Sequence, residues 1–436
     1  MTAIPPLYRW NALDETQRSS VLERLAAPTD PALETRVKDI MEQVRTGGDR
    51  ALRELEAELD GVELDEIEAS ESEIAEAGNR LSGEQRDAIQ AALDNIRACH
   101  AAQRPADSHT EPVPGVVCEQ RYRPLQAVGL YVPAGGAPLP STAMMLAAPA
   151  QLAGCAQRIL CAPPAADGSI NPAILYVAGQ CEVHRVFKLG GAQAVAAMAY
   201  GTESVPKVDK IFGPGSRWVA AAKQRAAMEP GGPAQDLPAG PTEAMVIADE
   251  TANAQFVALD LLSQAEHGED AHVLLLCLDE RLASAVQEAI ADQLRTLPRR
   301  DVLEKSLSAG ALLVVDSLET AVEVANRYAP EHLLLQVADP RALAAQVRNA
   351  GAVFLGPWSP ESSGDYCNGA NHVLPTYGSA RWASGLGLVD FYKRISVQEL
   401  SREGLERILG SIAVLARTEG LEAHARAAEV RRRTEP

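Results

Sequence analysis

The chain has 436 residues, more than a single hydrophobic core usually holds, so two or more domains are expected. Its formal net charge is −19 at pH 7. Such a surface disfavours broad contact with nucleic acid or with an anionic membrane, because both of these partners require a basic surface. A ligand that carries phosphate must therefore be held locally, by backbone N–H groups or a few side chains.

Neither a targeting signal nor a membrane span is expected. The residues from Met1 to Arg24 mix Pro, Asp, Glu and Arg without a continuous apolar stretch, which predicts a cytoplasmic protein. The stretch between Arg123 and Arg158 has no charged residue and is long enough to cross a bilayer. Its prolines and glycines, however, divide it into a strand, a loop and a short helix.

The segment from residue 30 to about residue 104 has a helical pattern throughout and predicts a small helical domain over residues 30–108. Its signals are an N-cap followed by a first-turn proline, glycines expected to stop a helix, and two capping boxes: Asp30-Pro31, Gly47-Gly48, Gly61, Ser70–Glu73 and Ser82–Gln85.

After Pro124, short apolar runs alternate with Ala-rich helical segments. The first series is AVGLYV, RILCA, RVFKL and KIFG, and the second is AMVIAD, HVLLLCL, ALLVV, HLLLQV and AVFLG. This alternation predicts an α/β protein with two Rossmann-like units of mainly parallel sheet, over residues 109–237 and 238–382. The tail from about Ser396 is expected to be helical and charged, without a core of its own.

The sequence contains neither a GxGxxG fingerprint after the first strand nor a Walker loop. Candidates for a nucleotide site are instead three Gly-rich turns that follow strands: Tyr131–Gly136, Gly190–Gln193 and Phe212–Ser216. In a parallel sheet such turns lie at the carboxyl edge, where helix N-termini face anions. The alternative is that they are ordinary tight turns between a strand and a helix.

Three further segments carry groups that could bind a metal or transfer protons. Gln264 and His267 share one face of a helix that stops at Gly268, which suits a metal but is also common on solvated helix ends. Glu331-His332, at the start of an apolar run, is either an acid/base pair or an exposed strand entry. The long Gly- and Pro-rich segment of residues 356–378 contains Asp365 and His372 and is typical of a functional loop.

In order and spacing, these segments resemble the histidinol dehydrogenase family, from YVPAGGAPLPST to EGLEAH near the end of the chain. The resemblance implies oxidation of L-histidinol to L-histidine through L-histidinaldehyde, at the end of histidine biosynthesis, with two NAD reduced in succession. It also implies that His332 is the general base for the alcohol and that Glu331 activates the water that attacks the aldehyde.

The family's ligand contacts fall on named positions of this chain. The resemblance implies one Zn²⁺ per subunit, bound by Gln264, His267, Asp365 and His424. It implies substrate contacts from the same four residues and from four others: Thr242, His332, His372 and Glu419. It implies NAD contacts from Tyr131, Gln193 and Ser216. Three positions depart from the family pattern: serine at 216 replaces the usual asparagine, threonine at 242 the usual serine, and alanine at 134 a common glycine.

The resemblance further implies a homodimer with shared active sites, in which a zinc ligand comes from His424 of the partner subunit. Residues 1–29 would pack on the second α/β unit, and residues 383–436 would form a helical extension that is exchanged between subunits. Alternatives are a dehydrogenase for another polar alcohol, a zinc hydrolase and a non-catalytic binding protein. NADH absorbance on adding histidinol would separate them.

Overall fold

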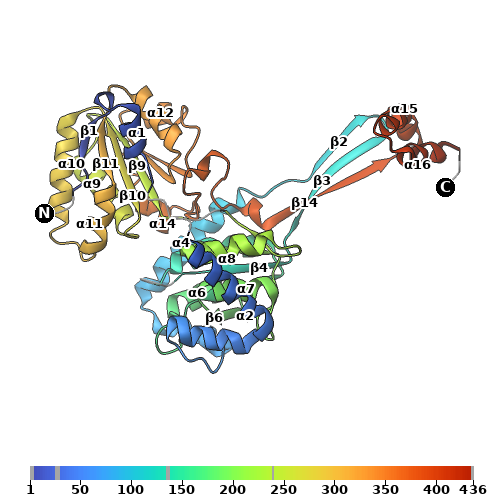
Figure 1. The fold of residues 1–436 in the computed structure, drawn as a ribbon, viewed down its shortest axis with the longest axis horizontal. Coiled ribbons are helices and arrows are strands. Elements are labelled where there is room, and N and C mark those ends of the chain that lie inside the picture. The colour runs from blue at the N-terminus through green and yellow to red at the C-terminus, as the bar shows by residue number, and fades with distance from the viewer. Residues whose placement is uncertain (1–3, 25–29, 134–137, 238–239, 434–436) are drawn as a thin grey trace.

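Three β-sheets organise the chain, which the computed structural model describes over residues 4–24, 30–133, 138–237 and 240–433. Two sheets are wholly parallel and lie in two α/β units, whereas the third is antiparallel and forms an arm that projects from them (Figure 1). The predicted fold class, two Rossmann-like α/β units with helical additions, is confirmed. Within the described ranges, none of the helices is long and apolar enough to span a bilayer.

The first α/β unit contains a five-stranded parallel sheet. In spatial order its strands are β6 (Arg185–Lys188), β5 (Gln157–Ala162), β4 (Ala127–Tyr131), β7 (Lys210–Phe212) and β8 (Ala234–Gln235). Its helices are α5 (Pro140–Ala153), α6 (Pro172–Gln180), α7 (Gly191–Tyr200) and α8 (Arg217–Met228). All five residues of β4 are buried, as expected for a strand covered by helices on both faces.

The N-terminal helices pack on this sheet and share its two cores. They are α2 (Pro31–Leu55), the π-helix Glu56–Asp60, α3 (Glu71–Glu76), the 3₁₀ turn Ala77–Arg80 and α4 (Gly83–Ala101). The predicted N-cap at Asp30 and both capping boxes are confirmed by their side-chain hydrogen bonds. The predicted stop at Gly47-Gly48 is confirmed, because the backbone at Gly48 is not helical, with φ 56°, and the segment labelled α2 consists of two helices that meet at this kink.

The second α/β unit contains a six-stranded parallel sheet. In spatial order its strands are β1 (Leu7–Arg9), β11 (Ala311–Val314), β10 (His272–Cys277), β9 (Glu243–Ala248), β12 (His332–Gln336) and β13 (Ala352–Leu355). The helices are α1 (Glu15–Val21), α9 (Ala254–Ala265), α10 (Glu280–Gln293), α11 (Arg300–Ala309), α12 (Leu318–Tyr328), α13 (Pro340–Ala344) and α14 (Glu361–Tyr366). The N-terminal strand β1 thus joins the sheet beside β11, far along the chain.

The arm consists of β2 (Ser108–Val113), β3 (Val116–Pro124) and β14 (Tyr392–Leu400), followed by α15 (Arg402–Thr418) and α16 (Glu422–Arg433). Strand β3 pairs antiparallel with both of the others. The two helices lie at the far end of the arm, away from both α/β units (Figure 1). The prediction of a helical tail from about Ser396 is wrong in its start, because Ser396 lies in β14 and the helix begins at Arg402.

Candidate active site

Two adjacent central strands of the second unit bring the predicted acid/base pair to the amino edge of their sheet. Strand β9 begins at Glu243, β12 begins at His332, and the register pairs His332 with Ala244. Helix α9 follows β9 and returns to this same edge, where it ends at Ala265 beside Gln264. Ligands of open α/β sheets usually bind at the carboxyl edge, so this placement differs from the common rule.

Glu331 and His332 are both buried and are held by Glu243, the first residue of β9, and by Thr242, which precedes it. Oε2 of Glu331 accepts hydrogen bonds from the backbone N–H of Glu243 at 2.9 Å and from Oγ1 of Thr242 at 2.5 Å. Nδ1 of His332 lies 3.1 Å from the carbonyl oxygen of Glu243 and 3.5 Å from Oε2 of Glu331. Because both of these oxygens only accept, we assign the ring proton to Nδ1, which leaves Nε2 as the basic nitrogen.

Acidic neighbours set the proton affinity of His332. Burial alone would lower the pKa of this imidazole, but the negative charges of Glu331, Glu361 and Asp365 outweigh burial and raise the pKa to about 9. These three carboxylates come from two different segments of the chain, and the fold gathers them around one ring. The site therefore has an excess of negative charge that a bound cation would offset.

Nitrogen and oxygen donors gather where the end of α9 meets α14. Nε2 of His267 lies 3.4 Å from Oδ2 of Asp365. One ligand atom from each of His267, Glu361 and Asp365 lies within 4.8 Å of the others. Burial raises the pKa of Asp365 and raises that of Glu361 to about 7. Buried Gln264 adds a side-chain oxygen, Oε1, that has no hydrogen-bond partner among the described residues. This donor set suits zinc.

His372 lies between this cluster and the first unit. Its Nδ1 is 3.0 Å from the backbone oxygen of Asp365, and its Nε2 is 3.4 Å from Oγ1 of Thr142 on α5. Burial lowers the pKa of His372 to about 4, so the ring is neutral at pH 7. A neutral ring in this position can offer one nitrogen to a polar ligand.

The predicted NAD residues lie at the carboxyl edge of the first unit's sheet. Tyr131 ends β4, and its hydroxyl accepts a hydrogen bond from Gly191 N–H at 3.1 Å. Gln193 is buried on α7, and its Nε2 donates to Glu56 at 2.9 Å and to Asp60 at 3.1 Å. Ser216 is the exposed N-cap of α8, and its side chain makes no cap hydrogen bond there. Ala134 lies outside the described residues.

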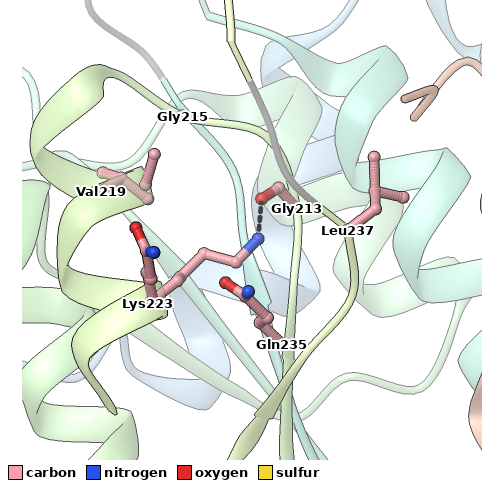
Figure 2. Close-up of a pocket in the computed structure, with 8 residues that line it drawn as sticks. Gly213, Gly215, Val219, Lys223, Gln235 and Leu237 are labelled. Atoms are coloured by element: carbon pink, nitrogen blue, oxygen red, sulfur yellow. Dashed lines mark hydrogen bonds between the residues drawn. The ribbon is translucent and has the colours of Figure 1, made fainter. Parts of the chain in front are cut away.

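A buried ion pair between Lys223 and Asp236 holds the turn that precedes Ser216. Figure 2 shows Lys223 and its hydrogen bond to Gly213. Nζ of Lys223, on α8, contacts Asp236 and donates to the carbonyl oxygen of Gly213 at 2.8 Å, whereas Oδ2 of Asp236 accepts from Gly213 N–H at 2.7 Å. Gly213 has φ 120°, and a Cβ there would lie 2.1 Å from the backbone oxygen of Tyr131. Both polar groups of Gly213 are thus fixed against the end of β4.

One cavity lies between the carboxyl edge of the first unit's sheet and the amino edge of the second unit's sheet. Gly213, Pro214 and Asp236 line it from the first unit, and Glu331 and His372 line it from the second. The candidate nucleotide turn of the first unit therefore faces Glu331 and His372 of the second unit. This arrangement can bring a bound cofactor and a bound substrate together at the junction of the units.

Comparison with known proteins identifies the family. The family model for histidinol dehydrogenase matches residues 24–432. The chain belongs to the histidinol dehydrogenase family. It is 50% identical over 422 residues to histidinol dehydrogenase of Vibrio vulnificus strain YJ016, with 97% of each chain covered. It is also 50% identical over 427 residues to that of Xylella fastidiosa strain Temecula1, with 98% of this chain and 99% of the relative covered.

A solved structure gives the same result. The crystal structure of histidinol dehydrogenase from Elizabethkingia anophelis matches with a TM-score of 0.95 and 41% sequence identity, over 99% of this chain and 98% of that one. The resemblance to the histidinol dehydrogenase family predicted from the motifs is thus confirmed, and the chain is an oxidoreductase of this family.

Two residues to which the histidinol dehydrogenase resemblance gives site roles lie far from the cavity in this chain. Glu419 caps the end of α15, and His424 lies on α16. Both are exposed, and both helices lie at the end of the arm (Figure 1). A single chain therefore brings together the other predicted site residues of the second unit but not these two.

Sequence reasoning missed Glu361. This residue is 1% exposed, its Oε2 accepts from Oγ of Ser263 at 2.9 Å, and its Oε1 is buried without a partner among the described residues. Its four-residue spacing from Asp365 is the signal that could have found it, because such spacing puts both carboxylates on one face of a helix.

Proposed function

We propose that this chain oxidises L-histidinol to L-histidine through L-histidinaldehyde, in the last steps of histidine biosynthesis, and reduces two NAD⁺ for each substrate. The observation that supports this function is the cavity in which Glu331 and His372 face the turn at Gly213, which is held by hydrogen bonds to Lys223 and Asp236. NAD⁺ would accept one hydride in each oxidation. Tyr131, Gln193 and Ser216 would contact it, and the exposed position of Ser216 leaves its hydroxyl accessible.

The donors at the end of α9 would hold one zinc ion per subunit. Gln264, His267 and Asp365 would supply three ligands, and His424 of the partner subunit the fourth. The short separation of His267 from Asp365 and the unpartnered Oε1 of Gln264 support this assignment. When bound, zinc would hold the imidazole and amino nitrogens of the substrate and so orient its alcohol carbon.

His332 and Glu331 would carry out the proton transfers. With the surrounding negative charge offset by a bound cation, the pKa of His332 would fall and the ring would be neutral. Nε2 then takes the alcohol proton, because Nδ1 is already directed at the carbonyl oxygen of Glu243. The Glu331 carboxylate removes a proton from the water that attacks the aldehyde, and two donors from β9 and the residue before it keep that carboxylate in place. Thr242, His372 and the partner's Glu419 would line the substrate site.

We propose that the arm completes the site of a second copy of the chain. His424 cannot join the other ligands from the end of its own arm as the chain is folded here (Figure 1). Helix α15 also exposes apolar side chains, with Val414 65% and Leu415 62% exposed, which is the kind of surface that protein interfaces cover. A two-fold homodimer would place each arm against the partner's body.

The stoichiometry of the reaction tests the proposed function. Purified enzyme given a limiting amount of histidinol should form two NADH per substrate consumed, measured by absorbance, with histidine as the product. One NADH per substrate with free aldehyde accumulating would contradict the four-electron reaction. A zinc hydrolase or a non-catalytic protein would form no NADH, and a dehydrogenase for another alcohol would turn over that alcohol in preference to histidinol.

A further inference from the structure

We propose that Thr242 is a positioning residue that fixes the side-chain amide of Gln264 for metal binding and couples it to Glu331. This inference rests on the proposed zinc site and deepens it. It assigns Thr242 a role toward the protein's own ligand, in addition to the substrate contact that the family resemblance implies. The observations that carry it are three hydrogen bonds and one unpartnered oxygen.

The hydrogen bonds form a chain from Gln264 to Glu331. Nε2 of Gln264 contacts Oγ1 of Thr242, and Oγ1 of Thr242 lies 2.5 Å from Oε2 of Glu331. The same carboxylate oxygen accepts from the backbone N–H of Glu243 at 2.9 Å. Thr242 immediately precedes β9, so its position is set by the sheet rather than by a free loop.

The chemistry of the three groups fixes the direction of each bond. An ionised carboxylate only accepts, so the single hydroxyl proton of Thr242 goes to Glu331. The hydroxyl oxygen can then only accept from Gln264, and the donor on Gln264 is its amide nitrogen. The opposite end of that amide must be Oε1. This assignment settles which amide atom points where, a choice that amide geometry alone leaves open.

The consequence is an oxygen directed away from the hydrogen-bond chain. Gln264 is fully buried, and its Oε1 accepts from no donor in the described part of the chain. A buried carbonyl oxygen without a partner is unfavourable unless a ligand meets it. The proposed zinc would do so. Thr242 thereby acts on the metal through Gln264, as outer-shell hydrogen bonds commonly do.

Zinc affinity of the full-length enzyme tests this role without using turnover. Thr242→Val keeps the shape of the side chain but removes the hydroxyl, and the Kd for Zn²⁺, measured by competition with a chromophoric chelator, should rise about 10- to 100-fold. Thr242→Ser keeps the hydroxyl, and its Kd should stay close to the wild-type value. If the valine variant does not fold, Thr242→Ala serves as the second truncation.

Thr202→Val is the matched control. Thr202 also donates to a buried carboxylate, Asp49 at 2.6 Å, and accepts from a backbone N–H, that of Val205 at 3.0 Å, but it lies in the first unit. Its loss should leave the Kd for Zn²⁺ unchanged. In addition, Co²⁺ bound to Thr242→Val should show absorption bands that differ from those of the wild-type cobalt enzyme, because the ligand set changes.

Gln264→Ala separates the two ways in which the proposal can fail. If Gln264→Ala weakens zinc binding while Thr242→Val and Thr242→Ala bind zinc as tightly as wild type, Thr242 does not orient the ligand and the zinc site stands. If Gln264→Ala itself binds zinc normally, the proposed zinc site is wrong, and the proposed role of Thr242 is then wrong as well. Weak zinc binding by Thr242→Ser would also overturn the inference, because the hydroxyl would then not be the cause.

Discussion

Two protein donors bind one carboxylate oxygen of Glu331 and hold this carboxylate at the cavity, where we propose that it acts as a base. We predict that Glu331→Gln slows aldehyde oxidation by about 10²- to 10⁴-fold, because an amide cannot remove a proton from water. Alcohol oxidation should slow much less, since it needs no activated water. Single-turnover formation of NADH from histidinol and from histidinaldehyde measures the two steps separately.

Glu243→Gln is the control for this prediction. Glu243 is also a buried carboxylate at the same edge, but it forms an ion pair with Arg24, with 2.5 Å between the nearest atoms. Loss of the Glu243 carboxylate should lower the free energy of unfolding and slow alcohol oxidation and aldehyde oxidation equally. Equal losses in Glu331→Gln would show that Glu331 merely connects β9 and β12.

His272 gives the protein a pH-dependent stability unrelated to catalysis. Its Nδ1 lies 2.7 Å from the hydroxyl of Tyr328 and its Nε2 lies 3.1 Å from the carbonyl oxygen of Ala309, so the neutral ring is fully paired. Burial lowers its pKa to about 4, below the usual 6.5. The unfolded chain therefore takes up the proton first, and the contribution of about 3 kcal/mol present above pH 6.5 is lost as the pH falls toward 4.

Urea unfolding at several pH values between 7 and 4 measures this effect. The wild-type free energy of unfolding should fall with pH more steeply than that of His272→Phe, which cannot titrate at this position. Parallel curves for the two proteins would contradict the prediction and assign the acid sensitivity to other groups.

At the residue scale, the sequence motifs and the family resemblance predicted Glu331, His332, His267 and Asp365 as candidates, but not their environment. An isolated imidazole titrates near 6.5. In the fold, Glu361 and Asp365 lie near His332 although they follow it by about thirty residues in the sequence, and their charges add to that of Glu331 in raising its pKa against the effect of burial. The hydrogen-bond direction at Gln264 likewise depends on Thr242, which only the packing of α9 beside β9 reveals.

At the scale of elements, the strands covered on both faces were predictable because their apolar runs are continuous. The arm was not. Strand β14 is exposed along most of its length and carries Lys393, Arg394 and Glu399, so it has no apolar alternation to detect. The sequence placed the acid/base pair at the start of a strand, but it could not show that this amino edge faces the first unit, because that depends on how the two units dock.

The buried ion pair between Lys223 and Asp236, which anchors the Gly213 turn, can be tested directly by mutation. Both side chains are almost fully buried, at 2% and 1% exposed. We predict that Lys223→Met lowers the free energy of unfolding by about 3–5 kcal/mol, because it leaves the Asp236 charge uncompensated. It should also raise KM for NAD, since the Gly213 turn loses one of its two anchors. Urea unfolding and steady-state kinetics measure these effects.

An exposed pair provides the comparison. Arg300 and Glu304 form an ion pair in which Arg300 is 51% exposed, and Arg300→Met should cost less than about 1 kcal/mol. Adding Asp236→Asn to Lys223→Met should restore part of the lost stability by removing the unpaired charge, while KM for NAD stays raised. A Lys223→Met variant with normal stability and normal KM would show that the turn needs no clamp.

At the scale of the whole molecule, the proposed exchange of arms predicts complementation. His332→Ala damages the body and His424→Ala damages the arm, so each homodimer should be inactive. After the two are unfolded and refolded together, about half of the dimers are mixed, and each mixed dimer has one site with an intact body and an intact arm. Roughly a quarter of all sites should then be active, as measured by NADH formation.

A control mixture of His332→Ala with Glu331→Gln, both lesions of the body, should gain no complete site. Mixed dimers can be counted independently by tagging each variant with a different affinity label. If the His332→Ala and His424→Ala mixture stays at background while mixed dimers are present, each arm serves its own chain or no site at all.

The arm also has a consequence for the order in which the chain is made. Strands β2 and β3 are complete at Pro124, but their partner β14 begins only at Tyr392. At synthesis rates of about 5–20 residues per second, one edge of β3 stays open on the ribosome for roughly 10–50 seconds. An open edge can pair with the wrong strand, and charged side chains discourage this. Charged side chains occupy alternate positions of β3, at Glu119, Arg121 and Arg123. They would discourage wrong pairing of the open edge until both α/β units have been synthesised.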